Sequence, residues 1–167
     1  MIGRRCTQAL AVGLYGMLAG ACPAGDDGDD GDTGSHAEPA FPAGYAASYT
    51  EVRNCRGSGD HDLNNIRILV DPTGLEAYQG RAVPFPEGAV VLKEEYDFGD
   101  VGCTGELVQW TVMTKLPAGS GSETLGWAWQ TVDADRHVVD EDEPRCIGCH
   151  TNCGVAPDGY DGTCTLP

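Results

Sequence analysis

The sequence is poor in basic and aromatic residues and has no long uninterrupted hydrophobic run. Its 167 residues include 10 Lys+Arg against 26 Asp+Glu, giving a formal net charge of −16 at pH 7, and only 7% are aromatic. So acidic a surface repels phosphate backbones, which excludes nucleic-acid binding as a main function. The apolar stretch at residues 9–21 is too short to cross a bilayer as a helix, so an integral membrane protein is not expected. The length fits one domain.

Residues 1–21 have the three parts of a secretory signal peptide. Arg4 and Arg5 precede the apolar stretch, which ends in small residues. Cys22 follows at a junction that resembles the bacterial lipobox, except that Leu18 lies one residue further from the cysteine than usual. We expect lipid on Cys22 as the only membrane anchor, in a periplasmic or outer-membrane lipoprotein of the bacterial cell envelope. An ordinary signal peptide cut nearby is the alternative.

Residues 22–38 are rich in glycine and aspartate and contain no large apolar residue. This composition predicts a flexible, self-repelling acidic tether. The repeated Asp-x-Asp spacing also suggests calcium, but the fixed loop length and terminal glutamate of an EF-hand are lacking. Removal of residues 1–21 would leave 8 basic and 26 acidic residues, a formal charge of −18. That charge favours a basic protein partner, or small neutral or cationic molecules.

The folded domain is expected to span residues 39–167. Its alternating or continuously apolar segments are separated by turns rich in proline and glycine, and they lie at residues 66–70, 89–93, 108–112 and 127–130. Short helical pieces are predicted at residues 45–49 and 75–78. This pattern predicts an α+β fold, mainly an antiparallel β-sheet with a few short helices.

Cys146-Ile-Gly-Cys149-His150 is a complete C-x-x-C-H motif. Two thiols at this spacing can each add to one vinyl group of haem, and the adjacent histidine then becomes the axial iron ligand. The residues therefore predict one covalently attached haem c, at one side of the sheet. A redox disulfide, a zinc site and a structural disulfide are alternatives. A redox disulfide lacks its usual βαβ surroundings, and zinc needs four ligands where only Cys153 and Cys164 lie near.

Four further cysteines lie in the same domain. An exported chain meets an oxidising compartment, where unpaired thiols need an explanation. Three pairings are available to four cysteines. We favour Cys55–Cys103, which joins the flanks of the middle region, and Cys153–Cys164, which closes the glycine-rich tail.

The second axial position of the iron decides between an electron carrier and a catalyst. Met113 is the only methionine after residue 21, and it lies in a predicted strand where core packing is the ordinary role. The histidines besides His150 are His36 in the tether, His137, and His61, which lies between two aspartates as in a polar turn. No second ligand is evident, and this favours an iron open to a small molecule.

Several segments resemble the cytochrome P-460 family over roughly residues 45–153. They are Gly59-Asp-His61, residues 66–72, Tyr78, residues 85–94, residues 110–115, residues 126–129 and the C-x-x-C-H motif. The resemblance implies a compact, mostly antiparallel β fold with an accessible distal pocket. Members oxidise hydroxylamine and carry a lysine crosslinked to the haem ring, and Lys93 matches that lysine. Related c-prime-beta cytochromes lack the crosslink and bind nitric oxide beneath an apolar pocket. The four extra cysteines and the acidic tether depart from the pattern.

The predicted function is an oxidoreductase acting on hydroxylamine or a related small nitrogen compound. Its electrons would pass to an external redox partner, expected to be a basic cytochrome. Removal of protons requires a nearby base, for which Glu106 is the first candidate and Glu94 and Glu95 are rivals. A nitric-oxide-binding protein and an electron carrier without catalysis are the alternative functions. Assembly as a homodimer is left open.

Overall fold

The computed structural model describes residues 37–153 and 159–165. The predicted signal peptide, Cys22, and all but the last two residues of the predicted tether lie outside these residues. In the part of the chain that is described, no helix has both the length and the apolar character needed to cross a membrane.

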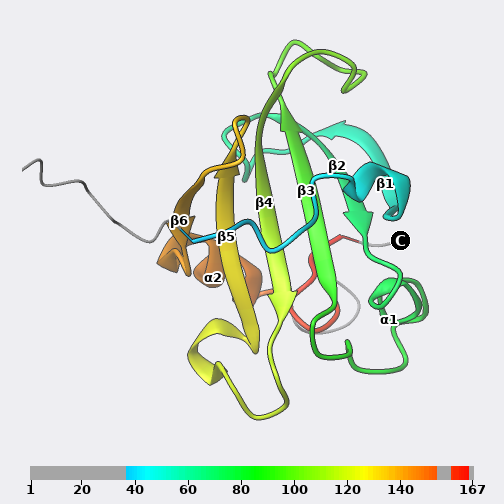
Figure 1. The fold of residues 1–167 in the computed structure, drawn as a ribbon, viewed down its shortest axis with the longest axis vertical. Coiled ribbons are helices and arrows are strands. Elements are labelled where there is room, and N and C mark those ends of the chain that lie inside the picture. The colour runs from blue at the N-terminus through cyan, green and yellow to red at the C-terminus, as the bar shows by residue number, and fades with distance from the viewer. Residues whose placement is uncertain (1–36, 154–158, 166–167) are drawn as a thin grey trace, which may run out of the picture. The chain divides into compact units, whose positions relative to one another are not determined.

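Six strands form one antiparallel sheet in which each strand pairs with the next along the chain (Figure 1). The sheet confirms the predicted mainly antiparallel α+β fold. Its order is β1-β2-β3-β4-β5-β6, and the strands are β1 Thr50–Gly57, β2 Asn65–Val70, β3 Val90–Tyr96, β4 Leu107–Lys115, β5 Trp127–Asp133 and β6 Val138–Glu141.

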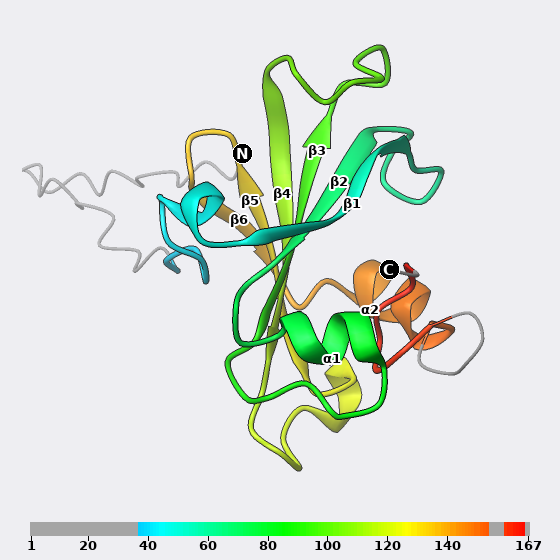
Figure 2. The same ribbon diagram turned by 90° about the vertical axis from the view of Figure 1, so that its right-hand side faces the viewer.

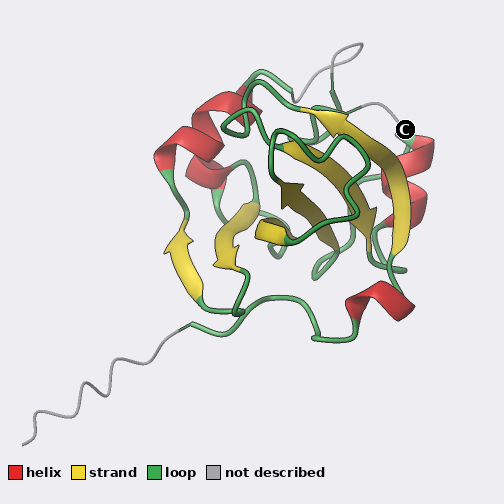
Figure 3. Ribbon diagram, turned by 90° about the horizontal axis from the view of Figure 1, so that it is seen from above, coloured by secondary structure: helices red, strands yellow, loops and turns green. Residues whose placement is uncertain are grey.

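The helices are short and lie outside the sheet. They are η1 Tyr45–Ala47, α1 Leu75–Gly80, η2 Ser122–Thr124 and α2 Pro144–Thr151. Viewed along the edge of the sheet, α1 and α2 lie on one side, whereas the segment that contains η1 lies on the other (Figure 2). Loops rather than helices make most of the connections between strands (Figure 3).

Both faces of the sheet are covered, and each has its own hydrophobic cluster. On the helix side, Ile68, Val91 and Trp129 belong to a cluster against which Leu75 of α1 and Ile147 of α2 pack. On the other side, Leu92, Trp110 and Val132 pack with Phe41, Tyr45 and Tyr49 of the N-terminal segment. Residues of β3 are therefore buried along its whole length, as expected for a central strand with cover on both faces.

The predicted apolar segments all form strands, but the edge strands were not predicted. β1 has the sequence TEVRNCRG and two irregularities in its pairing with β2, so it shows no regular alternation. β6 has only four residues, three of which are exposed. Edge strands of this kind bury too little to leave a period-two pattern in the sequence.

Both expected disulfides, Cys55–Cys103 and Cys153–Cys164, are present. The first joins β1 to the loop between β3 and β4, and the second joins the end of α2 to the tail. Of the cysteines in residues 37–153 and 159–165, only Cys146 and Cys149 have free thiols.

Asp71 holds the turn that leads from β2 into α1. Its buried carboxylate accepts hydrogen bonds from the backbone N–H groups of Val90 (2.9 Å), Gly74 (3.0 Å) and Thr73 (3.2 Å). Because Asp71→Ala would leave buried donors without partners, we expect it to lower the free energy of unfolding by about 2–4 kcal/mol. Chemical denaturation measures this loss. Asp97→Ala is the control, since the carboxylate of Asp97 is exposed and accepts its hydrogen bond from the Gly99 N–H at the surface. An equal loss in both variants would contradict the assignment.

Candidate functional site

Helix α2 presents the C-x-x-C-H motif on one face. The helix begins with Pro144 at its first turn, where a proline without an N–H is well tolerated. Cys146 and Cys149 are three residues apart and His150 is four residues after Cys146, so all three side chains lie on neighbouring positions of the helix surface. Cys146 packs beside the helix-side hydrophobic cluster, Cys149 is exposed and His150 is buried.

The imidazole of His150 is held in one orientation. Its Nδ1 donates a hydrogen bond to the carbonyl oxygen of Gly162 at 2.6 Å. The Trp129 ring packs edge to face against the imidazole, with 4.8 Å between the ring centroids. Burial and then the nearby Lys93 ammonium lower the pKa of His150 to about 3. The ring is therefore neutral at ordinary pH, with its proton on Nδ1 and an unprotonated Nε2, the form of imidazole that binds a metal.

Lys93 of β3 reaches the same place from the sheet. Its side chain is buried, and Nζ lies 2.7 Å from Nε2 of His61 and 3.5 Å from Nε2 of His150. Burial lowers the pKa of Lys93 to about 8, although the Glu95 carboxylate opposes this shift. At pH 7 the Lys93 amine is then uncharged in about a tenth of the molecules.

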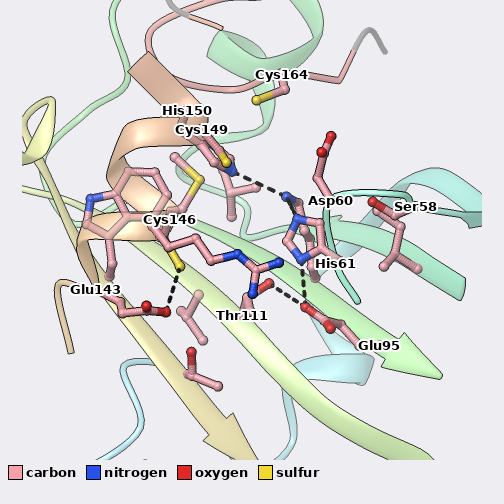
Figure 4. Close-up of a pocket in the computed structure, with 18 of the residues that line it drawn as sticks. Ser58, Asp60, His61, Glu95, Thr111, Glu143, Cys146, Cys149, His150 and Cys164 are labelled. Atoms are coloured by element: carbon pink, nitrogen blue, oxygen red, sulfur yellow. Dashed lines mark hydrogen bonds and ion pairs between the residues drawn. The ribbon is translucent and has the colours of Figure 1, made fainter. Parts of the chain in front are cut away.

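Glu95 is a fully buried carboxylate on the same face of β3 as Lys93. It accepts hydrogen bonds from His61 Nδ1 (2.9 Å) and from the side chains of Gln109 (3.0 Å), Thr111 (3.1 Å) and Asn64 (3.2 Å). Burial raises the pKa of Glu95, but these bonds, led by that from His61, outweigh it and the pKa falls below its ordinary value. Glu95, His61 and Lys93 therefore form a hydrogen-bonded chain that ends at His150 (Figure 4).

These groups surround a cavity of about 280 Å³ between α2 and the sheet. The polar chain occupies one part of its wall, together with Cys146 and Cys149. Apolar side chains form another part, namely Ile66, Val91 and Met113. Figure 4 shows Cys146, Cys149 and His150 entering from the helix, and His61 turned toward Glu95.

The donor set fits a haem. It combines a neutral, buried histidine whose Nε2 faces the cavity, two free thiols on the same helix, and a partly apolar wall. Fold and site together define a haem protein built on an antiparallel sheet.

The comparison with known families gives the same class. The sequence profile of the family described as Cytochrome P460 matches residues 42–156, and the chain belongs to this family. Family membership implies a haem cofactor. No curated protein sequence matches the chain.

The structure brings together most of the residues singled out from the sequence. Cys146, Cys149, His150 and Lys93 all line the cavity. Glu106, the first candidate for the base, is exposed just before β4 and is not among the lining residues. The reason is local: Glu106 lies in the loop that leads into β4, before the pairing with β3 starts at Leu107.

Of the two rival bases, only Glu95 faces the cavity. Glu94 points to the opposite face of β3, where Tyr45, Tyr96 and Arg67 bond its carboxylate. The signal for Glu95 was available, since it follows Lys93 by two residues and a strand repeats every two residues.

His61 was interpreted as a polar turn residue, and the structure corrects this. It does lie in a turn, but its ring points inward between Lys93 and Glu95. The next two residues, Asp62 and Leu63, have positive φ angles of 52° and 66°, so the chain reverses sharply there. No sequence signal predicts this reversal, because neither residue is a glycine. Met113 is in the core as predicted, but it also lines the cavity.

Proposed function

We propose that this protein is an exported mono-haem c-type cytochrome that oxidises hydroxylamine or a related small nitrogen compound. Cys146 and Cys149 would hold haem c through thioether bonds, and His150 would bind its iron. The observation that carries the proposal is the convergence of His150, Lys93, His61 and Glu95 on one cavity. An electron carrier needs no such chain of proton-holding groups beside its iron.

The bound haem would accept electrons from the substrate, and the chain's own residues have separate tasks. Oxidation of hydroxylamine releases protons with the electrons, so a base must take them up. Glu95, whose carboxylate is ionised and fully buried, fills this role through His61, which carries the proton between Glu95 and the cavity. His61 Nδ1–H donates to Glu95, which leaves His61 Nε2 to accept a proton.

Lys93 is the residue proposed to be crosslinked to the haem ring. Its Nζ lies 3.5 Å from the proposed ligand atom of His150, so it reaches the place that the haem would take. The lowered pKa of about 8 fits this role, because burial favours the neutral amine, whose lone pair is free to form a bond.

Export, lipid anchoring and a basic redox partner belong to the same proposal. The two disulfides support an oxidising compartment such as the periplasm. The formal charge of −18 expected after cleavage before Cys22 supports a basic cytochrome as the electron acceptor. Intact-mass analysis of membrane-extracted protein tests lipidation at Cys22.

Covalent haem attachment is the first experiment. We expect the parent protein, matured in a periplasm with the haem-attachment machinery, to retain haem after denaturation. The Cys146→Ser/Cys149→Ser variant is expected to lose all of it, because no thioether bond can form. Cys55→Ser/Cys103→Ser is the matched control and should keep its haem. Haem-free parent protein would contradict the proposal and leave Cys146 and Cys149 to another use.

The absorption spectrum and turnover then test the activity. A strongly red-shifted ferrous Soret band in the parent, replaced by an ordinary high-spin c-type band in Lys93→Met, is the expected result for a crosslink. Steady turnover of hydroxylamine with an artificial oxidant is expected in the parent. A low-spin spectrum would mean that His61 or Met113 occupies the second axial position, and it would contradict catalysis at the iron.

Nitric oxide binding without catalysis is the second candidate. Ile66, Val91 and Met113 give the cavity an apolar wall, which favours a small uncharged ligand. A protein that binds nitric oxide but shows no turnover with hydroxylamine would establish this candidate in place of the first.

A further inference from the structure

The hydrogen-bond acceptor for His150 comes from the tail of the chain. Gly162 supplies the carbonyl oxygen, 2.6 Å from His150 Nδ1. The family match ends at residue 156, so Gly162 and the disulfide-bonded Cys164 lie beyond it. The contact therefore joins a histidine inside the matched region to a glycine outside it.

Residues 159–165 are fastened on both sides of Gly162. Cys164 is bonded to Cys153, whose backbone N–H in turn donates to the His150 carbonyl at 3.0 Å. On the other side, the backbone carbonyl of Asp161 accepts a hydrogen bond from Trp127 Nε1 (2.9 Å). The carboxylate of Asp161 forms an ion pair with Lys115 (2.9 Å). The acceptor thus lies between a covalent anchor to α2 and a polar anchor to the sheet.

Gly162 itself can hardly be replaced. Its φ of +81° lies in the left-handed region, and a Cβ there would meet Trp127 Nε1 at 3.3 Å. Trp127 is fully buried, so its ring has little room to move. A side chain at this position would shift the carbonyl away from His150.

We propose that the disulfide-closed tail, residues 159–165, is a positioning clamp for the axial histidine. The proposal rests on His150 being the iron ligand, as in the proposed function. Bonding of Nδ1–H to the Gly162 carbonyl fixes the tautomer and turns Nε2 toward the cavity. It also makes the imidazole a stronger electron donor, which strengthens the iron–nitrogen bond and lowers the reduction potential. The Cys153–Cys164 bond keeps the carbonyl in place while the iron is bound.

The experiment compares two disulfide deletions in the haem-loaded full chain. Cys153→Ser/Cys164→Ser opens the clamp. Cys55→Ser/Cys103→Ser opens the disulfide between β1 and the loop that joins β3 to β4, and it is the matched control. We expect the iron–histidine stretching band of the ferrous protein, measured by resonance Raman, to shift to lower frequency in the first variant only. Its midpoint potential should shift upward, with no change in the control. Equal spectra and equal potentials in both variants would overturn the clamp.

A second pair of variants leaves every cysteine in place, in case the opened clamp does not fold. Gly162→Ala should give the same shifts of band and potential. Gly88→Ala is its control, because Gly88 has a similar φ of +79° but open space around it. Unchanged band and potential in a folded Gly162→Ala protein would also overturn the proposal. Haem retained with unchanged band and potential contradicts the clamp alone, whereas loss of haem from the parent contradicts the proposed function and the clamp together.

Discussion

Glu95→Gln is expected to lower the turnover of hydroxylamine by a factor on the order of 10²–10⁴, the usual contribution of a positioned general base. The substitution keeps the size of the side chain and one acceptor oxygen, so Gln109, Thr111 and Asn64 retain most of their contacts. It removes the carboxylate charge that lets Glu95 act as the base. Initial rates with an artificial oxidant, over a range of pH, measure the loss.

The control for this prediction is Glu106→Gln. Glu106 is exposed and lies outside the cavity lining, so its variant should retain the parent rate within about twofold, as for most surface substitutions. A fall in rate with Glu106→Gln and none with Glu95→Gln would restore the assignment made from the sequence. Haem content and ferrous spectrum should be the same in both variants.

Lys93→Met should make the haem-free protein more stable at pH 7 by about 3 kcal/mol, because burial of the Lys93 ammonium lowers its pKa from 10.5 to about 8. Below pH 8 the amine is charged in both folded and unfolded chains, and the folded state bears the full cost of burial. Between pH 8 and 10.5 the folded state loses its proton first, so the parent gains stability as pH rises. The advantage of the variant should therefore shrink over that range.

Urea denaturation of haem-free protein at several pH values measures this difference. Lys115→Met is the control, because Lys115 is ion-paired with Asp161 and lies over the Trp127 ring. That variant should show no gain at pH 7. A constant difference between Lys93→Met and the parent from pH 7 to pH 10.5 would show that packing, and not the buried charge, sets the stability.

Much of the fold could be predicted because the central strands bury enough apolar surface to leave a pattern. Residues 66–70 and 108–112 alternate, and both form strands that pair with β3. β1 and β6 escaped prediction since edge strands expose one side and carry little pattern. The disulfides could be predicted because the C-x-x-C-H motif left only four cysteines to pair.

The site residues that could be predicted are those identified by neighbouring residues in the sequence. Cys146, Cys149 and His150 are contiguous, and their spacing alone identifies the chemistry. His61 and Gly162 belong to the site only through tertiary contacts. His61 contacts Lys93, which is 32 residues away in the sequence, and Gly162 contacts His150, which is 12 residues away. Contacts of this kind depend on where turns and disulfides place the chain, and the type of a single residue does not predict that placement.

Strand β3 carries three adjacent charged residues through the middle of the sheet, and this has a consequence for how the sequence can change. Lys93 and Glu95 face the cavity, whereas Glu94 serves the tyrosines and Arg67 on the other face. Insertion or deletion of one residue in this strand would exchange the two sets, since a slip of one position inverts every side chain. The two networks thus depend on the same strand register, so β3 can vary by substitution but not in length.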